Sequence, residues 1–152
     1  MKGYLTKGKT FKVFITVDTS GEYPKVVPDV EEEKLKESPN LQREWAEFYR
    51  WDFKESNRIT QESTEVDVVS GKTKFNWVKI NELKLRYLLK DWSLVDENEK
   101  KIEVKRNATE VEPSSFEKVL SVDFTVLNAF LSKANEVLEF GGEAAKNFTK
   151  KP

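Results

Sequence analysis

The chain has 152 residues, with 26 basic and 27 acidic side chains and neither histidine nor cysteine; this length is typical of a single domain. Without cysteine there are no disulfides, thiolate nucleophiles or zinc–cysteine sites, and without histidine there is no Ser-His-Asp triad and no imidazole metal ligand. A net charge of −1 argues against nucleic acid as a partner, because such binding needs an excess of Lys and Arg. The start of the chain has no apolar signal region and no run of about 18 apolar residues occurs, so we expect no membrane partner and a cytoplasmic location.

The first predicted element is an amino-terminal hairpin. Phe11, Val13, Ile15 and Val17 alternate with mostly polar residues, which is the period of a half-buried strand. Residues 18–22 read as a turn, and residues 23–27 as a second short strand. A short helix, or a solvated charged connector, follows from residue 29 to Pro39.

Asn40 is placed to cap the next predicted helix, in which Leu41, Trp45 and Phe48 recur at helical spacing. The helix extends to about Asp52. It carries most of the densest aromatic cluster of the chain, which comprises Trp45, Phe48, Tyr49, Trp51 and Phe53. This cluster could be core or could be a partner-binding surface.

A polar stretch over residues 54–62 leads into a second predicted hairpin around Ser70 and Gly71. The apolar pattern from Val78 to Trp92 then predicts a broad-faced central helix. Ile102 and Val104 are expected to be extended.

The last predicted element is a long amphipathic helix of about 25 residues that begins after Pro113, where Ser114 and Glu117 form a capping-box pattern. A joint is expected near residues 121–123. Gly141 and Gly142 end the helix. Together these elements predict an α+β fold with two β-hairpins packed against about three helices, in one domain over residues 1–140 with a flexible polar tail over 141–152.

No phosphate-binding loop or calcium loop is present, so no cofactor is expected. Carboxylates that converged in space could still form an enzymatic site, and the candidates are Glu31, Glu32, Glu33, Glu62, Glu65 and Asp67. Their spacing gives no sign of convergence. We therefore expect a protein that is not an enzyme and has no metal site.

Two surfaces are candidates for binding a protein partner or a second copy of the chain. One is the predicted aromatic helix. The other is the carboxy-terminal helix, whose apolar stripe is wider than one neighbour would cover. The candidate partner-binding residues are Trp45, Phe48, Tyr49, Phe124, Phe130, Leu131 and Leu138.

The hairpin VDVVSGKTKF, the helix pattern WVKINELKLRYLLKDWSLVDENEKK, the extended IEV and a long final helix follow one another over residues 64–140. This order resembles the small tail assembly chaperones and related tail-assembly proteins encoded between the major tail protein and tape measure genes of long-tailed bacteriophages. The resemblance implies a protein that binds apolar helices of the tape measure protein, or of another tail protein, in the host cytoplasm. It implies no individual functional residue. One alternative is a structural virion subunit, for head-tail joining or decoration, in which the edge of the amino-terminal hairpin contacts neighbouring subunits. Another is a different phage-encoded protein-binding module.

Overall fold

The computed structural model describes residues 3–140, and its centre is a four-stranded antiparallel sheet in the order β2-β1-β3-β6. β1 (Thr10–Asp18) and β3 (Leu41–Tyr49) pair along nine residues. The shorter strands β2 (Lys25–Val27) and β6 (Leu89–Trp92) flank this pair. The predicted α+β fold class is confirmed. The central sheet, however, also contains β3 and β6, which lie in segments predicted as helices.

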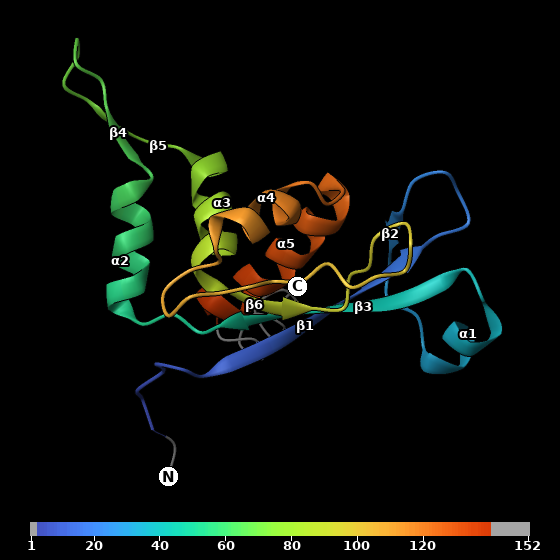
Figure 1. Ribbon diagram of the computed structural model, residues 1–152. Coiled ribbons are helices and arrows are strands. Elements are labelled where there is room, and N and C mark those ends of the chain that lie inside the picture. The colour runs from blue at the N-terminus through green and yellow to red at the C-terminus, as the bar shows by residue number, and fades with distance from the viewer. Residues whose placement is uncertain (1–2, 141–152) are drawn as a thin grey trace, which may run out of the picture.

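The helices lie on both sides of this sheet, in unequal number. Figure 1 shows α3 (Trp77–Leu88), α4 (Pro113–Leu120) and α5 (Phe124–Phe140) over one face, and α1 (Glu32–Glu37) on the other. α2 (Phe53–Glu62) stands beside α3. One hydrophobic cluster contains residues of the sheet and of α2 to α5, so these elements share a core.

The predicted amino-terminal hairpin is confirmed as β1 and β2. Val13, Ile15 and Val17 are at most 5% exposed and face the helices, while Lys12 and Phe14 are exposed on the opposite face. The period of two therefore identified both the strand and its buried side.

The predicted helix from Leu41 to Asp52 is wrong, because residues 41–49 form β3 and residues 50–52 connect it to α2. Ala46 and Phe48 point to the helices and are buried, whereas Trp45, Glu47 and Tyr49 alternate with them on the other face. Each face of β3 thus mixes polar and apolar residues, which hid the period of two. Pairing with β1 along the whole strand outweighs the local helical spacing.

The predicted central helix is correct up to Leu88, and the predicted continuation to Trp92 is wrong. Leu89 begins β6, which pairs with the end of β3 across a register shift. Leu89 and Trp92 are fully buried, and the indole N–H of Trp92 donates to the carbonyl of Ile102 (2.7 Å). The apolar run at 88–92 suits a buried strand as well as a helix, because no Gly or Pro marks the boundary.

The predicted joint near residues 121–123 is confirmed, since it separates α4 from α5. The Asp123 carboxylate accepts from the N–H of Thr125 (2.9 Å) at the start of α5. Hydrogen bonds from Thr125 hold the pKa of Asp123 below its usual value. The capping box does not form, because Glu112 occupies the N-cap position and Pro113 the first helical position.

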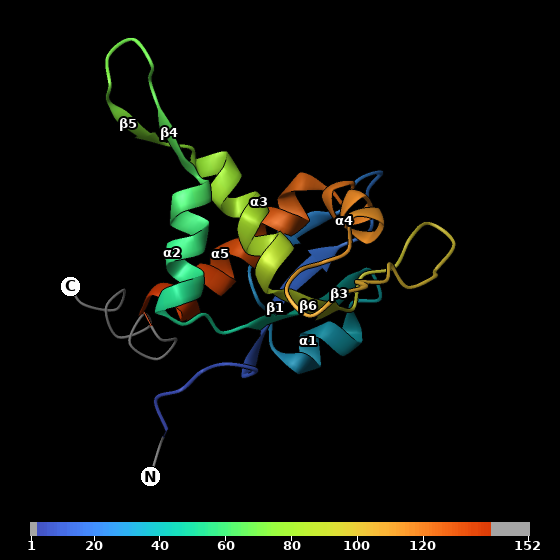
Figure 2. The same cartoon turned by 60° about the vertical axis from the view of Figure 1, so that its left-hand side comes forward.

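The predicted second hairpin is confirmed as β4 (Thr64–Val66) and β5 (Thr73–Phe75). It does not pack against the helices as predicted, since Figures 1 and 2 show it projecting from the ends of α2 and α3. The predicted tail over residues 141–152 lies outside the described residues. Within residues 3–140, no helix combines the length and apolar character that crossing a membrane requires.

Candidate protein-binding surface

The projecting hairpin and the first residues of α3 expose several large apolar side chains. We call residues 64–78 the arm. Its exposed apolar residues are Val66, Val68, Val69, Phe75, Trp77 and Val78. Val68 and Val69 at the tip are each 96% exposed, and Trp77 at the base is 71% exposed. Contiguous exposed apolar side chains of this kind mark interaction sites.

Hydrogen bonds within the turn hold the tip of the arm in one conformation. The N–H of Asp67 donates to the carbonyl of Lys72 (2.9 Å), and the N–H of Gly71 donates to the carbonyl of Asp67 (2.7 Å). Gly71 has φ +70°, a left-handed conformation that favours glycine. The Asp67 carboxylate accepts from the N–H of Val69 (2.9 Å), and this bond contributes most to lowering the pKa of Asp67. The turn therefore presents Val68 and Val69 on an ordered tip.

The base of the arm is fixed to the end of α2. The N–H of Asn76 donates to the carbonyl of Ser63 (2.9 Å), and its side-chain amide donates to Glu65 (3.2 Å). Ser63 is fully buried and its hydroxyl donates to the carbonyl of Ile59 (2.6 Å). The oxygen of the Asn76 side chain also accepts from the N–H of Lys79 (3.1 Å) and caps α3. One residue thus joins the arm to both helices.

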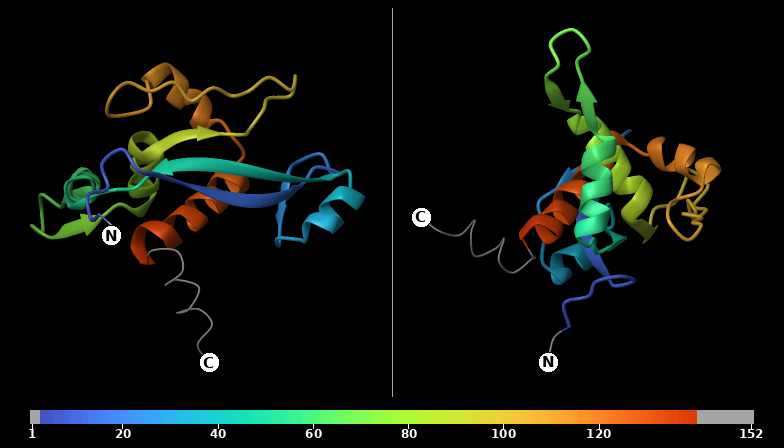
Figure 3. Two further views of the ribbon diagram at one scale, coloured as in Figure 1. Left: turned by 90° about the horizontal axis from the view of Figure 1, so that it is seen from below. Right: turned by 90° about the vertical axis from the view of Figure 1, so that its left-hand side faces the viewer.

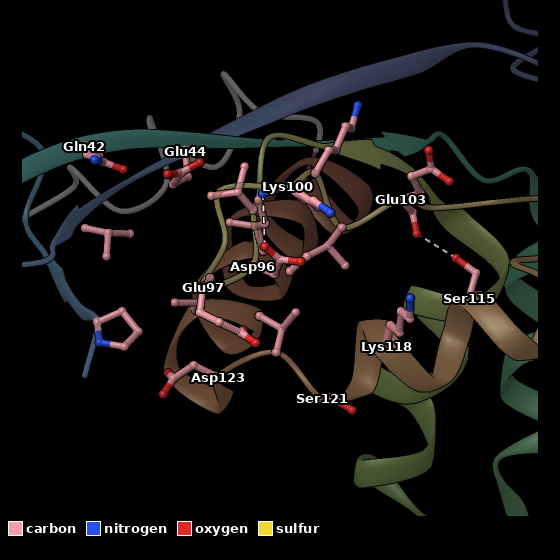
Figure 4. Close-up of a pocket in the computed structure, with 18 of the residues that line it drawn as sticks. Gln42, Glu44, Asp96, Glu97, Lys100, Glu103, Ser115, Lys118, Ser121 and Asp123 are labelled. Atoms are coloured by element: carbon pink, nitrogen blue, oxygen red, sulfur yellow. Dashed lines mark hydrogen bonds between the residues drawn. The ribbon is translucent and has the colours of Figure 1, made fainter. Parts of the chain in front are cut away.

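A second feature is a cleft of about 830 Å³ between the segment 94–105, the sheet and the α4–α5 joint. Its apolar lining residues are Val17, Pro24, Leu94, Val95, Ile102, Val122 and Val126. Figure 4 shows charged side chains around this cleft, among them Lys100, Lys118 and Glu97. A volume of this size can accept a small ligand or apolar side chains of a partner.

Three polar side chains that line the cleft, Ser115, Asp96 and Asp123, hydrogen-bond to nearby backbone groups. The Ser115 hydroxyl donates to the carbonyl of Glu103 (2.7 Å) and accepts from the N–H of Lys105 (3.0 Å). The Asp96 carboxylate accepts from the N–H of Lys100 (3.0 Å), and Asp123 caps α5. These bonds fix the loop over residues 94–105 and the start of α5.

Three of the seven predicted partner-binding residues need correction. Phe48, Phe130 and Leu131 are 1%, 0% and 6% exposed and belong to the core. The stripe of the carboxy-terminal helix is wide because α5 covers both β1 and β2. These three side chains therefore hold the protein's own elements together and are inaccessible to a partner.

The other four predicted residues are at least partly accessible but lie apart in the fold. Phe124 is 77% exposed at the start of α5. Leu138 is partly buried against the core near the end of the same helix. Tyr49, at the end of β3, is likewise partly buried against the core. Trp45 is partly exposed on the face of the sheet away from α5, where Lys12 Nζ lies 4.2 Å from the centroid of its ring system. The structure does not bring the four into one surface.

The six acids considered for an enzymatic site also separate into two groups. Glu31, Glu32 and Glu33 lie at the start of α1, while Glu62, Glu65 and Asp67 lie at the end of α2 and on the arm. Figure 1 places these groups at opposite ends of the molecule. Within residues 3–140, no three Asp or Glu residues are grouped to hold a metal ion.

The sequence pattern contained a signal for the arm that the hairpin prediction did not use. Val68 and Val69 occupy the turn between two strands, where polar residues and glycine are usual. A turn leaves its side chains in water when the hairpin extends beyond the core. Apolar residues at such a turn therefore indicate a binding surface rather than a buried one.

Comparison with protein-family models, curated proteins and solved structures gave no match to this chain. Its function is therefore inferred from the surfaces of the molecule.

Proposed function

We propose that this protein binds an apolar segment of another protein and that the arm is its main contact. The observation that carries the proposal is the exposure of Val68 and Val69, each 96%, at the tip of a hydrogen-bonded turn. Burying apolar surface gains about 25 cal/mol per Å². An ordered tip loses little conformational entropy when it binds, so more of this gain remains as affinity.

The surroundings of the arm suit a protein that stays dispersed before it binds. Glu65, Asp67, Lys72 and Lys74 are exposed beside the apolar residues. Interspersed charges of both signs limit non-specific association. The neighbouring apolar side chains at Phe75 and Trp77, whose ring centroids lie 6.3 Å apart, widen the contact toward the base of the arm.

The specific role that we propose is that of an accessory protein in phage tail assembly. In this role the arm binds apolar helices of a tape measure or other tail protein, in the host cytoplasm, and keeps them from aggregating. Support comes from the resemblance over residues 64–140, because that region begins with the arm. No catalytic step and no cofactor are part of the proposal.

The alternative role is a structural virion subunit. An uncovered edge of β1 favours it, since a strand edge can pair with a neighbouring subunit. Mass spectrometry of mature particles separates the two roles: a fixed copy number in the particle supports the structural subunit, and absence from the particle supports the assembly factor.

A binding experiment tests the arm directly. The probe is a labelled amphipathic peptide of Leu and Gln, with Leu every third or fourth residue so that it presents one apolar stripe. Anisotropy measures its affinity for the wild-type protein and for the double variant Val68→Ser/Val69→Ser. We expect the double variant to bind about tenfold more weakly or worse.

The matched control is Phe124→Ser, which removes an exposed apolar side chain from a different surface. We expect this variant to bind the peptide as the wild type does. Equal binding by the arm variant and the wild type would show that the arm is not the contact. A gene order that places this gene next to a tape measure gene would support the specific role.

A further inference from the structure

β1 has an edge that no strand in the described part of the chain fully covers. β1 pairs with β3 along its whole length, whereas β2 covers only the last three residues of β1, Thr16 to Asp18. β2 ends at Val27 because the next residue, Pro28, has no N–H with which to continue the ladder. Figure 3 (left) shows β1 running along the margin of the sheet beyond the end of β2.

The register identifies the backbone groups at this edge. The carbonyl of Lys9 accepts from the N–H of Arg50 (2.9 Å), so odd-numbered residues of β1 bond to β3. Successive residues of a strand direct their backbone groups to alternate sides. Thr10, Lys12 and Phe14 therefore direct their N–H and C=O groups away from β3. Within residues 3–140 these groups have no hydrogen-bond partner, which leaves a row of donors and acceptors matched to an extended chain.

A positive charge lies in the middle of this edge. Lys12 is exposed and rests over the ring of Trp45, and it forms no ion pair with the carboxylates of residues 3–140. The nearest carboxylate across the strand pair, Glu47, accepts instead from the hydroxyl of Thr10 (2.6 Å) and lies 3.8 Å from Lys90 Nζ. An acidic side chain on an added strand would be the first carboxylate to pair with Lys12.

The other face of an added strand would meet apolar surface. A hollow of about 210 Å³ lies where β2 ends, between the sheet and α5, and Ile15, Val27 and Ala129 contribute to its lining. Side chains opposite Val13 and Ile15 point to the same side of the sheet as these two residues do. An apolar side chain at those positions would fill the hollow and extend the core.

A second copy of the chain does not fit the same edge. Two β1 edges paired antiparallel over Thr10, Lys12 and Phe14 place Lys12 directly opposite Lys12. Like charges at directly opposed positions destabilise a strand pair. The edge charge thus disfavours self-pairing and favours an acidic partner.

We propose that the edge of β1 from Thr10 to Phe14 binds an extended segment of another protein in which apolar and acidic residues alternate. The apolar residues face α5 and the acidic residues face Lys12. This contact adds one antiparallel strand to the sheet. This contact is separate from the arm, which lies at the amino-terminal end of α3. It does not depend on the function proposed for the arm.

Amide hydrogen exchange by NMR on the full chain tests this proposal, with the peptide Val-Glu-Val-Glu-Val-Glu-Val as the probe. In the free protein we expect rapid exchange at Thr10, Lys12 and Phe14 and slow exchange at Val13 and Ile15, because only the latter bond to β3. Saturating peptide should slow the three rapid amides by about tenfold or more. The counterpart peptide with Lys in place of Glu should give no protection.

Variants at Lys12 test the charge. Lys12→Gln should weaken binding of the acidic peptide, and Lys12→Glu should weaken it further, by about tenfold or more. The control Lys100→Glu makes the same charge change in the loop after β6 and should leave the affinity for the acidic peptide unchanged. The proposal is overturned if the amides of Thr10, Lys12 and Phe14 are already protected in the free protein, if the acidic peptide leaves their exchange unchanged, or if the basic peptide binds equally well. A dimer in sedimentation that protects the same amides would also overturn it, in favour of a second copy.

Discussion

Phe124 and Phe130 lie on the same helix and differ in what surrounds them. Phe130 is 0% exposed among residues of the sheet, whereas Phe124 is 77% exposed at the start of α5. Removal of a buried aromatic ring loses its transfer free energy and leaves a cavity, while removal of an exposed ring loses little. Phe130 therefore contributes to the stability of the fold, whereas Phe124 contributes little to it.

We expect Phe130→Ala to lower the free energy of unfolding by about 3–5 kcal/mol. The matched change Phe124→Ala should alter it by less than about 0.5 kcal/mol. Urea denaturation followed by circular dichroism measures both values. Equal effects of the two substitutions would contradict the burial of Phe130.

Tyr87 makes stability depend on pH at the alkaline end. Burial, with a smaller contribution from the hydrogen bond to the Glu62 carboxylate, raises the pKa of the Tyr87 phenol above its ordinary value of 10.0. The folded protein then holds this proton more tightly than the unfolded chain does. The resulting stability is present in full below pH 10 and is lost as the pH rises through the folded-state pKa.

We therefore expect the wild-type free energy of unfolding to fall more steeply above about pH 10 than that of Tyr87→Phe, because the variant has no phenol to ionise. Urea denaturation at a series of pH values gives both curves. Tyr23→Phe, at an exposed tyrosine, should follow the wild-type curve. Parallel curves for wild type and Tyr87→Phe would contradict the shift.

At the scale of elements, α2 is a helix with little buried surface and a side-chain cap at its amino-terminal end. Only Ile59 of α2 is buried. The Asp52 carboxylate accepts from the N–H of Glu55 (2.8 Å) at the amino-terminal end, and Arg58 lies 3.8 Å from the Tyr87 ring centroid on α3. A helix with so little buried surface opens locally before the core unfolds.

We expect Asp52→Ala to cost α2 about 1 kcal/mol of local stability. Amide exchange in α2 should speed up by about fivefold at that cost, with exchange in β3 unchanged. Asp52→Asn retains a capping oxygen and should behave as the wild type does. Faster exchange in β3 as well would show that the cap supports the whole domain.

The elements that the sequence predicted correctly are those whose period shows without neighbours. In β1, Val13, Ile15 and Val17 recur at every second position although Phe14 lies between two of them, and the α4–α5 joint coincides with a break in the apolar pattern at Asp123. β3 was predicted as a helix because its faces are mixed, and only its pairing with β1 decides its conformation. The candidate site failed for a related reason: spacing showed that Phe130 was on an apolar stripe, but not how much of that stripe β1 and β2 cover.

At the scale of the whole molecule, the sheet and its helices form one core from which the arm projects. Trp92 belongs to this core and is fully buried, while Trp77 at the base of the arm is 71% exposed. Trp45 and Trp51 are partly buried. The four tryptophans therefore report on different parts of the protein.

We expect iodide to quench mainly the fluorescence of Trp77, because it is the most exposed of the four indoles. Trp77→Phe should remove most of the readily quenched emission, while the remaining emission stays protected until the protein unfolds. When the Leu/Gln peptide binds, quenching of the wild-type protein should fall toward the level of Trp77→Phe, because a partner on the arm covers the indole. Unchanged quenching at saturating peptide would place the bound peptide away from the base of the arm. Combined with the Val68→Ser/Val69→Ser result, this measurement distinguishes a contact at the tip alone from one that extends along the arm to the core.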